Sequence, residues 1–122
     1  MAKILAVEDE ALVRILIVET LNDVGHTVLE APDGEAALAI VNQTPDLDLI
    51  VTDVRMPKMD GFSLAVRAHQ LRPGLGVLFM TGYSGADAPP ELPAVKVMQK
   101  PFDPEDLIVA INSMLGDAAR GV

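Results

Sequence analysis

Five short apolar runs alternate with helical patterns along the chain, and this alternation limits the possible folds more than any other feature. The runs are Lys3–Val7, Thr27–Ala31, Asp48–Thr52, Val77–Met80 and Val95–Met98. Continuous runs rich in Val, Ile and Leu are typical of parallel strands that helices cover on both faces. We therefore expect an α/β fold with a five-stranded parallel sheet in the order 2-1-3-4-5, whose switch point lies between strands one and three.

The segments between these runs carry the start and stop signals of helices. Asp33 and Asp60 stand at N-cap positions, and Asp103 followed by Pro104 marks the start of the last helix. Gly25 is placed to end the first helix. The stripe expected to face the sheet in that helix consists of Val13, Leu16, Ile17, Leu21 and Val24.

One segment and the carboxyl end depart from this regular pattern. A fourth helix is expected between Ser84 and Ala94, but the stretch contains Gly85, Pro89, Pro90 and Pro93. Proline in a helix interior costs about 3 kcal/mol, so we expect a short helical turn or a mobile loop there. We also expect the residues after Leu115 to be frayed.

Length, charge and composition exclude several classes of protein. The 122 residues correspond to one domain, residues 1–122, with a core from residue 3 to about residue 115. A net charge of −9, from 18 acidic and 9 basic residues, disfavours direct binding of nucleic acid or anionic membranes. The chain has no cysteine, which excludes disulfides and thiolate metal sites. It has neither a signal-peptide layout nor a spanning apolar run, so we expect a soluble cytoplasmic protein.

Polar residues follow four of the five runs, at the point where each run ends. They are Glu8 and Asp9, then Asp53, Thr81 and Lys100. Because the carboxyl ends of parallel strands meet at one edge of a sheet, we expect these residues to converge. Clustered carboxylates repel one another unless a cation lies among them, and hard oxygen ligands suit Mg²⁺. Asp53 is then a candidate nucleophile for a phosphoryl group, with Thr81 and Lys100 neutralising the charge on its oxygens.

Each of these residues also has a purely structural explanation. Glu8-Asp9 could cap the helix that follows, Asp53 could be a turn residue, and Lys100-Pro101 could simply end a strand. Independent accidents would not all fall at carboxyl ends in the order acid pair, acid, hydroxyl and amine. The combination therefore favours a shared chemical role.

The same residues resemble the receiver domain of two-component response regulators, from Lys3 to about Leu115. The resemblance rests on Val7-Glu8-Asp9-Glu10, Asp53 with Met56-Pro57 and Asp60-Gly61, Thr81-Gly82, and Lys100-Pro101-Phe102. It implies a flavodoxin-like receiver fold and a role as a phosphorylation-dependent switch in a phosphorelay. In such a domain Asp53 accepts a phosphoryl group from a sensor histidine kinase or a histidine phosphotransfer protein, and the readout reaches a downstream protein target.

The resemblance also implies a role for each site residue. Asp9 would be a direct Mg²⁺ ligand, Glu8 would hold metal-bound water, and the backbone carbonyl of Arg55 would be a further ligand. Thr81 would bond the phosphoryl group and move toward it, and Lys100 would pair with one of its oxygens. The only reactions implied are Mg²⁺-dependent self-phosphorylation and autodephosphorylation, so the chain is not expected to be an enzyme with a separate substrate.

Several further details around the site agree with the resemblance or depart from it. The Lys100-Pro101 peptide is often cis in such domains, which proline permits. Val97 stands where receivers usually have a Tyr or Phe that swings inward, so another residue must serve the switch, and Tyr83 is a candidate. The segment Phe79-Met80-Thr81-Gly82-Tyr83 resembles the Phe-x-Thr-Gly-Tyr signature of a subgroup of mostly single-domain receivers with a mobile loop after strand four. Glu8 in place of the usual Asp is a lesser departure.

Three alternatives stay open at this point. The chain could be a receiver module cut from a hybrid kinase or larger regulator, although its end soon after the last helix favours a single-domain protein. It could act as a phosphate sink instead of driving an output. It could be an aspartyl-phosphate hydrolase, but such enzymes usually need an acid two residues after the nucleophile, where Arg55 stands. A receiver unable to accept phosphate is disfavoured by the intact acid, Thr and Lys set.

Overall fold

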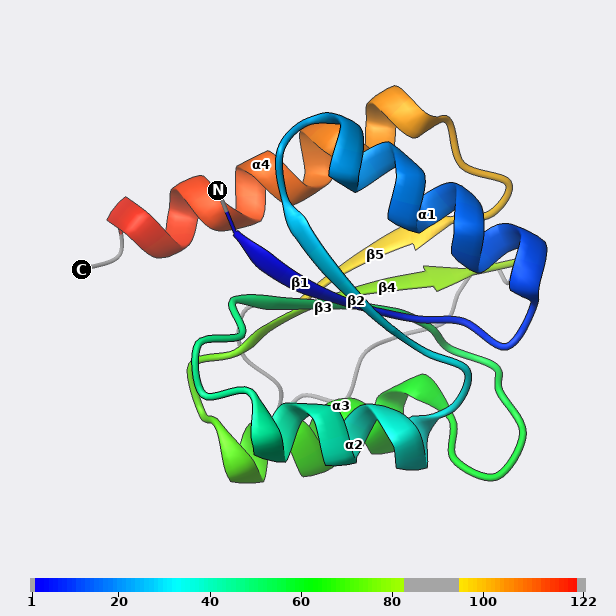
Figure 1. Cartoon of the computed structure of the whole chain (residues 1–122), viewed down its shortest axis with the longest axis vertical. Coiled ribbons are helices and arrows are strands. Elements are labelled where there is room, and N and C mark those ends of the chain that lie inside the picture. Colours follow the sequence, from blue (N-terminus) through cyan, green and yellow to red (C-terminus); the bar gives the residue numbers. More distant parts are fainter. Residues whose placement is uncertain (1, 83–94, 121–122) are drawn as a thin grey trace.

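The computed structural model describes residues 2–82 and 95–120, in which strands and helices alternate along most of the chain (Figure 1). The strands are β1 (Lys3–Val7), β2 (Thr27–Ala31), β3 (Leu49–Asp53), β4 (Gly76–Thr81) and β5 (Val95–Gln99). The helices are α1 (Ala11–Asp23), α2 (Gly34–Gln43), α3 (Gly61–Leu71) and α4 (Pro104–Arg120). The short helix or mobile loop predicted between Ser84 and Ala94 lies outside the described residues.

The strands form one parallel sheet in the order β2-β1-β3-β4-β5, so the predicted topology is confirmed. Its register brings the carboxyl ends of neighbouring strands level with each other. Val7 lies opposite Thr52, Asp53 opposite Met80, and Thr81 opposite Gln99. Residues that follow these strands therefore share one edge of the sheet.

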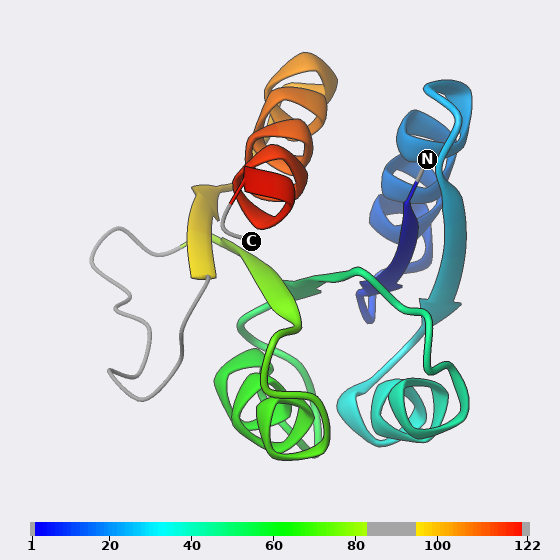
Figure 2. The same ribbon diagram turned by 90° about the vertical axis from the view of Figure 1, so that its left-hand side faces the viewer.

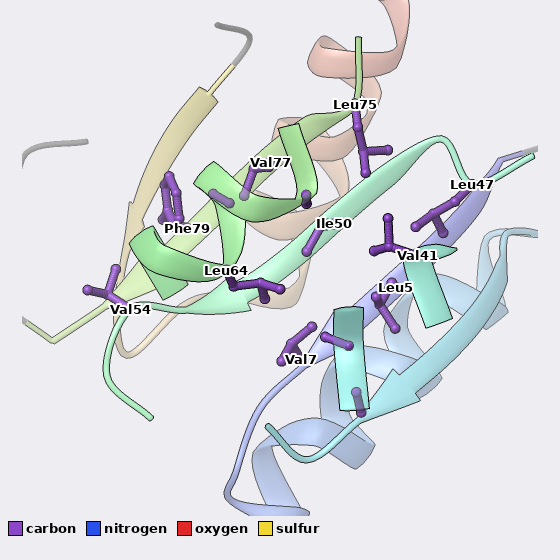
Figure 3. Close-up of a cluster of buried hydrophobic side chains, with 14 residues drawn as sticks. Leu5, Val7, Val41, Leu47, Ile50, Val54, Leu64, Leu75, Val77 and Phe79 are labelled. Carbon is purple, nitrogen blue, oxygen red and sulfur yellow. The ribbon is translucent and has the colours of Figure 1, made fainter. Parts of the chain in front are cut away.

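Helices cover both faces of the sheet, α1 and α4 on one and α2 and α3 on the other (Figures 1 and 2). Each face has its own cluster of buried aliphatic side chains. Figure 3 shows the cluster under α2 and α3, where Leu5, Ile50 and Leu64 pack together with Phe79. Every residue of β3 and β4 is buried, which explains why these strands appear in the sequence as continuous apolar runs.

The predicted helix signals act as expected. The carboxylates of Asp33, Asp60 and Asp103 each accept a hydrogen bond from a backbone N–H two or three residues further on, at 2.7–2.9 Å. Gly25 follows α1 with φ of 95°, a left-handed conformation that glycine adopts without strain. These local interactions set where the helices begin and end.

The predicted buried stripe of α1 is only partly correct. Ile17 and Leu21 are fully buried, but Leu16 and Val24 are 43% and 41% exposed, so the prediction was wrong for these two. The helix carries apolar residues around most of its circumference, including Leu12, which is 82% exposed. Spacing alone could not decide which apolar face packs on the sheet.

Helix α4 is longer than the sequence suggested. It continues to Arg120, so the prediction of fraying after Leu115 was wrong for residues 116–120, while residues 121–122 lie outside the described residues. No proline interrupts this end of the chain, and Ala118 and Ala119 are strong helix formers.

Candidate functional site

The structure brings the predicted polar residues together at the carboxyl edge of the sheet. Glu8 and Asp9 directly follow β1, Asp53 ends β3, Thr81 ends β4 and Lys100 follows β5. Carboxylate oxygens of the three acids all lie within 4.8 Å of one another. The Lys100 Nζ lies 2.6 Å from Glu8 Oε1 and 3.0 Å from Asp53 Oδ2. The sheet topology thus gathers three carboxylates at one edge and brings an ammonium group into contact with two of them.

Glu8 is buried within this group and has both carboxylate oxygens bonded. Its side chain is 0% exposed; Oε1 accepts from Lys100, and Oε2 accepts from the Glu10 N–H at 3.0 Å. Burial raises the pKa of Glu8, although the bonds from Lys100 and Glu10 oppose this. Burial by itself lowers the pKa of Lys100, but the bonds to Glu8 and Asp53 outweigh it and raise that pKa above its ordinary value. Lys100 is therefore a permanent positive charge in the site.

Asp53 is held close to the backbone of the following loop and helix. It is 9% exposed, and its Oδ1 lies 3.4 Å from the Arg55 N–H. The Gly61 N–H donates to the Val54 carbonyl at 2.7 Å. A Cβ on Gly61 would lie 2.2 Å from the Asp53 carbonyl oxygen, so only glycine permits this approach. The start of α3 thereby fixes the backbone that carries Asp53.

Thr81 and Lys100 are joined through the backbone. Thr81 is 2% exposed, its carbonyl accepts from the Lys100 N–H at 2.7 Å, and the Lys100–Pro101 peptide is cis. Val97 on β5 is 42% exposed, and Tyr83 lies outside the described residues. The switch roles predicted for Thr81, Tyr83 and Val97 stay predictions.

The acids fit a divalent cation in charge, chemistry and spacing. Three acids lie close together and Lys100 bonds to two of them, so a further cation among the acids would relieve their mutual repulsion. Mg²⁺ prefers a few oxygen ligands held at about 2.0–2.1 Å, which places two ligands of one ion roughly 3–4 Å apart. The oxygens of the acids lie within 4.8 Å of one another, so small side-chain movements would bring them to that spacing. Direct ligation by Asp9, Asp53 and the Arg55 carbonyl stays a prediction.

The arrangement matches a known family of signalling domains. The family model for the response regulator receiver domain matches residues 4–112. The chain belongs to this family. It is therefore a module of two-component phosphorelay signalling, as its relatives are.

Individual relatives support the assignment over nearly the whole chain. The response regulator receiver protein CpdR of Brucella abortus is 36% identical over 118 residues, covering 94% of this chain and 98% of CpdR. The sensor kinase CckA of the same organism is 36% identical, but the match covers 12% of its length. The crystal structure of the receiver domain of a hybrid histidine kinase CckA superposes with a TM-score of 0.83 at 35% identity, covering 93% of this chain and 99% of that domain.

Two features of this receiver were not singled out by sequence patterns. Arg14 on α1 binds the carbonyl of Glu8 and the carboxylate of Glu30 on β2, a contact that appears only once β2 is known to lie beside β1. The direct Glu8–Lys100 bond joins residues 92 positions apart.

Within residues 2–82 and 95–120, no helix combines the length and apolar character that crossing a membrane requires.

Proposed function

We propose that this receiver is a phosphoacceptor switch of a two-component phosphorelay, with Asp53 as the accepting residue. The observation that supports this best is the position of Asp53 at the end of the central strand, 3.0 Å from Lys100 Nζ and within 4.8 Å of two further carboxylates. A nucleophilic carboxylate beside a fixed positive charge is suited to accept a group whose oxygens are negative. The expected donor is a phosphohistidine of a sensor histidine kinase or histidine phosphotransfer protein, in the cytoplasm.

The transfer is a simple displacement at phosphorus. An Asp53 carboxylate oxygen attacks the phosphorus, the new P–O bond forms as the P–N bond breaks, and the donor histidine leaves with the electron pair and takes up a proton. In autodephosphorylation, water attacks the phosphorus, the P–O bond breaks, and the Asp53 carboxylate returns with release of inorganic phosphate. Most of the catalysis in such transfers comes from positioning and charge stabilisation.

Several groups around Asp53 would together stabilise the negative charge on the phosphoryl oxygens. Lys100 pairs with a phosphoryl oxygen, and the Thr81 hydroxyl donates to another. Mg²⁺, held by Asp9, Asp53 and the Arg55 carbonyl, would neutralise the charge on phosphoryl oxygens when bound. Glu8, with its side chain 0% exposed, keeps Lys100 at the site and is placed to hold metal-bound water.

This receiver has an apolar surface beside the site on which we expect the donor protein to dock. A groove of about 350 Å³ between α1 and the segment that joins β5 to α4 is lined by Glu10, Val13, Leu16, Lys100, Pro101 and Phe102. Leu12 and Ile15 extend this apolar surface along α1, 82% and 48% exposed. Since Lys100 belongs to both groove and site, a helix seated there would present its phosphohistidine to Asp53. Leu12→Ala should slow transfer from the kinase without slowing labelling by a small phosphodonor.

The readout is expected to begin at Thr81. Phosphorylation adds roughly −1.5 to −2 charges, which draws the Thr81 hydroxyl toward the phosphoryl group. With Val97 in place of the usual aromatic residue, Tyr83 and the segment up to Ala94 are the candidates that carry the change to a target protein. Whether that output or a phosphate-sink role dominates depends on the lifetime of the phosphoryl group.

The proposal is tested by labelling purified protein with a small phosphodonor such as phosphoramidate in the presence of Mg²⁺. Intact-mass analysis should show one added phosphoryl group that disappears in Asp53→Ala and in the presence of a chelator. Asp106→Asn, which removes an exposed acid from α4, is the matched control and should label normally. Labelling of Asp53→Ala at another residue would contradict the assignment.

Two alternatives are distinguished by further measurements. A module of a hybrid kinase has support from the CckA match, in which this chain corresponds to 12% of the kinase, and the full reading frame of the gene decides it. An aspartyl-phosphate hydrolase is disfavoured because Arg55 occupies the place of the second acid. Repeated turnover of a generic phosphomonoester would favour the hydrolase.

A further inference from the structure

We propose that Arg14 is a positioning residue for the metal site, acting through the peptide bond between Glu8 and Asp9. The Arg14 Nη1 donates to the Glu8 carbonyl oxygen at 2.7 Å, and its Nε donates to Glu30 Oε1 at 3.1 Å. One guanidinium thus connects the turn that carries the acid pair to the neighbouring strand β2. This inference rests on the proposed use of Glu8, Asp9 and Asp53 as an Mg²⁺ site.

Every polar group of Glu8, the first residue of the turn after β1, takes part in a hydrogen bond. The Glu8 N–H donates to the Ala31 carbonyl at 3.1 Å, and the two Glu8 carboxylate oxygens accept from Lys100 and from the Glu10 N–H. The remaining group is the Glu8 carbonyl, which Arg14 binds. Arg14 therefore completes a set of bonds that fixes Glu8.

The Glu8 carbonyl belongs to the peptide plane that leads into Asp9. Asp9 is exposed, so packing contributes little to its orientation, and the preceding peptide plane decides where its side chain starts. A rotation of that plane would move the Asp9 carboxylate away from Glu8 and Asp53. Partners that orient metal ligands in this way typically change metal affinity by about 10–100-fold when they are removed.

Arg14 is itself well anchored. Its backbone N–H donates to the Glu10 carbonyl at 2.9 Å in the first turn of α1, and its side chain is 20% exposed. The planar guanidinium can bind two acceptors in fixed directions, which a lysine ammonium on a flexible stem does less well. The site therefore uses a property specific to arginine.

The direction in which Mg²⁺ affinity changes when Arg14 is replaced distinguishes a positioning role from a simple effect of its charge. Arg14 is a cation near a cation-binding site, so through charge alone its removal would tighten Mg²⁺ binding. Through positioning, its removal would weaken binding. Arg14→Lys keeps the charge but not the two-pronged contact, and so it isolates the geometric contribution.

The experiment is an Mg²⁺ titration of the full chain by isothermal calorimetry. Arg14→Ala is expected to weaken Mg²⁺ binding about tenfold, and Arg14→Lys to weaken it in the same direction. Arg67→Ala, which removes the same charge from an exposed position on α3, should stay within about twofold of the wild type. Glu30→Ala should weaken binding only when Arg14 is present. Thermal unfolding of each variant verifies that the fold persists.

Labelling by phosphoramidate supplies an independent readout. For Arg14→Ala, saturating Mg²⁺ should restore the labelling rate to within about twofold of the wild type, because only the metal requirement changes. Unchanged or tighter Mg²⁺ binding in both Arg14 variants would overturn the inference, as would a wild-type chain that binds no Mg²⁺. Mg²⁺ binding without any labelling would overturn the proposed phosphoryl transfer and leave the role of Arg14 standing.

Discussion

Replacing Lys100 with methionine tests whether its charge compensates the buried carboxylate of Glu8. Methionine has an unbranched apolar side chain as long as the lysine stem, with sulfur in place of Cδ, and it lacks the ammonium group, so packing changes little. Glu8 is 0% exposed and lies 2.6 Å from Lys100 Nζ, which makes this the most buried ion pair of the site. In chelator, Lys100→Met should therefore leave a buried negative charge without its cation.

The size of the effect follows from the burial of the pair. Breaking a fully buried ion pair by removing one partner costs about 3–5 kcal/mol. Because the side chains of Lys100 and Asp53 are 22% and 13% exposed, we expect a lower loss of unfolding free energy, about 2–3 kcal/mol. For a domain of this size, the melting temperature should fall by about 10 °C.

The loss should also depend on pH in a defined direction. Burial raises the pKa of Glu8 above its ordinary value, and the bond from Lys100 is among the causes that oppose this rise. With the pKa raised, the folded state binds more protons than the unfolded state, so the Glu8 contribution is present below pH 4.5 and is lost as pH rises through the folded pKa. Without Lys100 this pKa rises further, and the loss of stability with pH becomes larger.

A double-mutant cycle in urea supplies the control. Glu8→Gln removes the buried charge, so Lys100→Met should cost at least about 1.5 kcal/mol less in the Glu8→Gln background. The added pH dependence should disappear in the double variant. Equal costs of Lys100→Met in both backgrounds would show that Lys100 does not compensate Glu8, and the reasoning about the site's charge balance would fail.

Three further predictions address the backbone and the metal. Gly61→Ala should lower the unfolding free energy by more than about 2 kcal/mol in urea and slow phosphodonor labelling, because its Cβ meets the Asp53 carbonyl; unchanged stability would contradict the close approach. Arg72→Ala should cost about 2–3 kcal/mol, since its guanidinium binds four backbone carbonyls at and after the end of α2; a loss below about 0.5 kcal/mol would refute this. Asp9→Asn should abolish the rise in melting temperature that Mg²⁺ gives the wild type. In chelator the same variant should be more stable than the wild type, because the repulsion between carboxylates is relieved. A retained Mg²⁺ effect would exclude Asp9 as a ligand.

The sequence by itself predicted the strand order and the meeting of Glu8, Asp9, Asp53 and Lys100 at one edge of the sheet. Continuous apolar runs that alternate with helical patterns are typical of parallel strands covered by helices on both faces, and polar residues directly after such runs emerge at one edge of the sheet. Local signals were equally reliable, because Asp33, Asp60 and Asp103 cap helices through neighbours two or three residues away. Such interactions depend on the nearby chain alone.

The tertiary structure alone decided which groups touch. The Glu8–Lys100 bond spans 92 positions, and Arg14 meets Glu30 only because β2 lies beside β1. The buried face of α1 could not be predicted either, since apolar residues surround most of that helix and only packing against the sheet selects Ile17 and Leu21. Side-chain partners depend on the distances between elements, and no spacing within one segment contains that information.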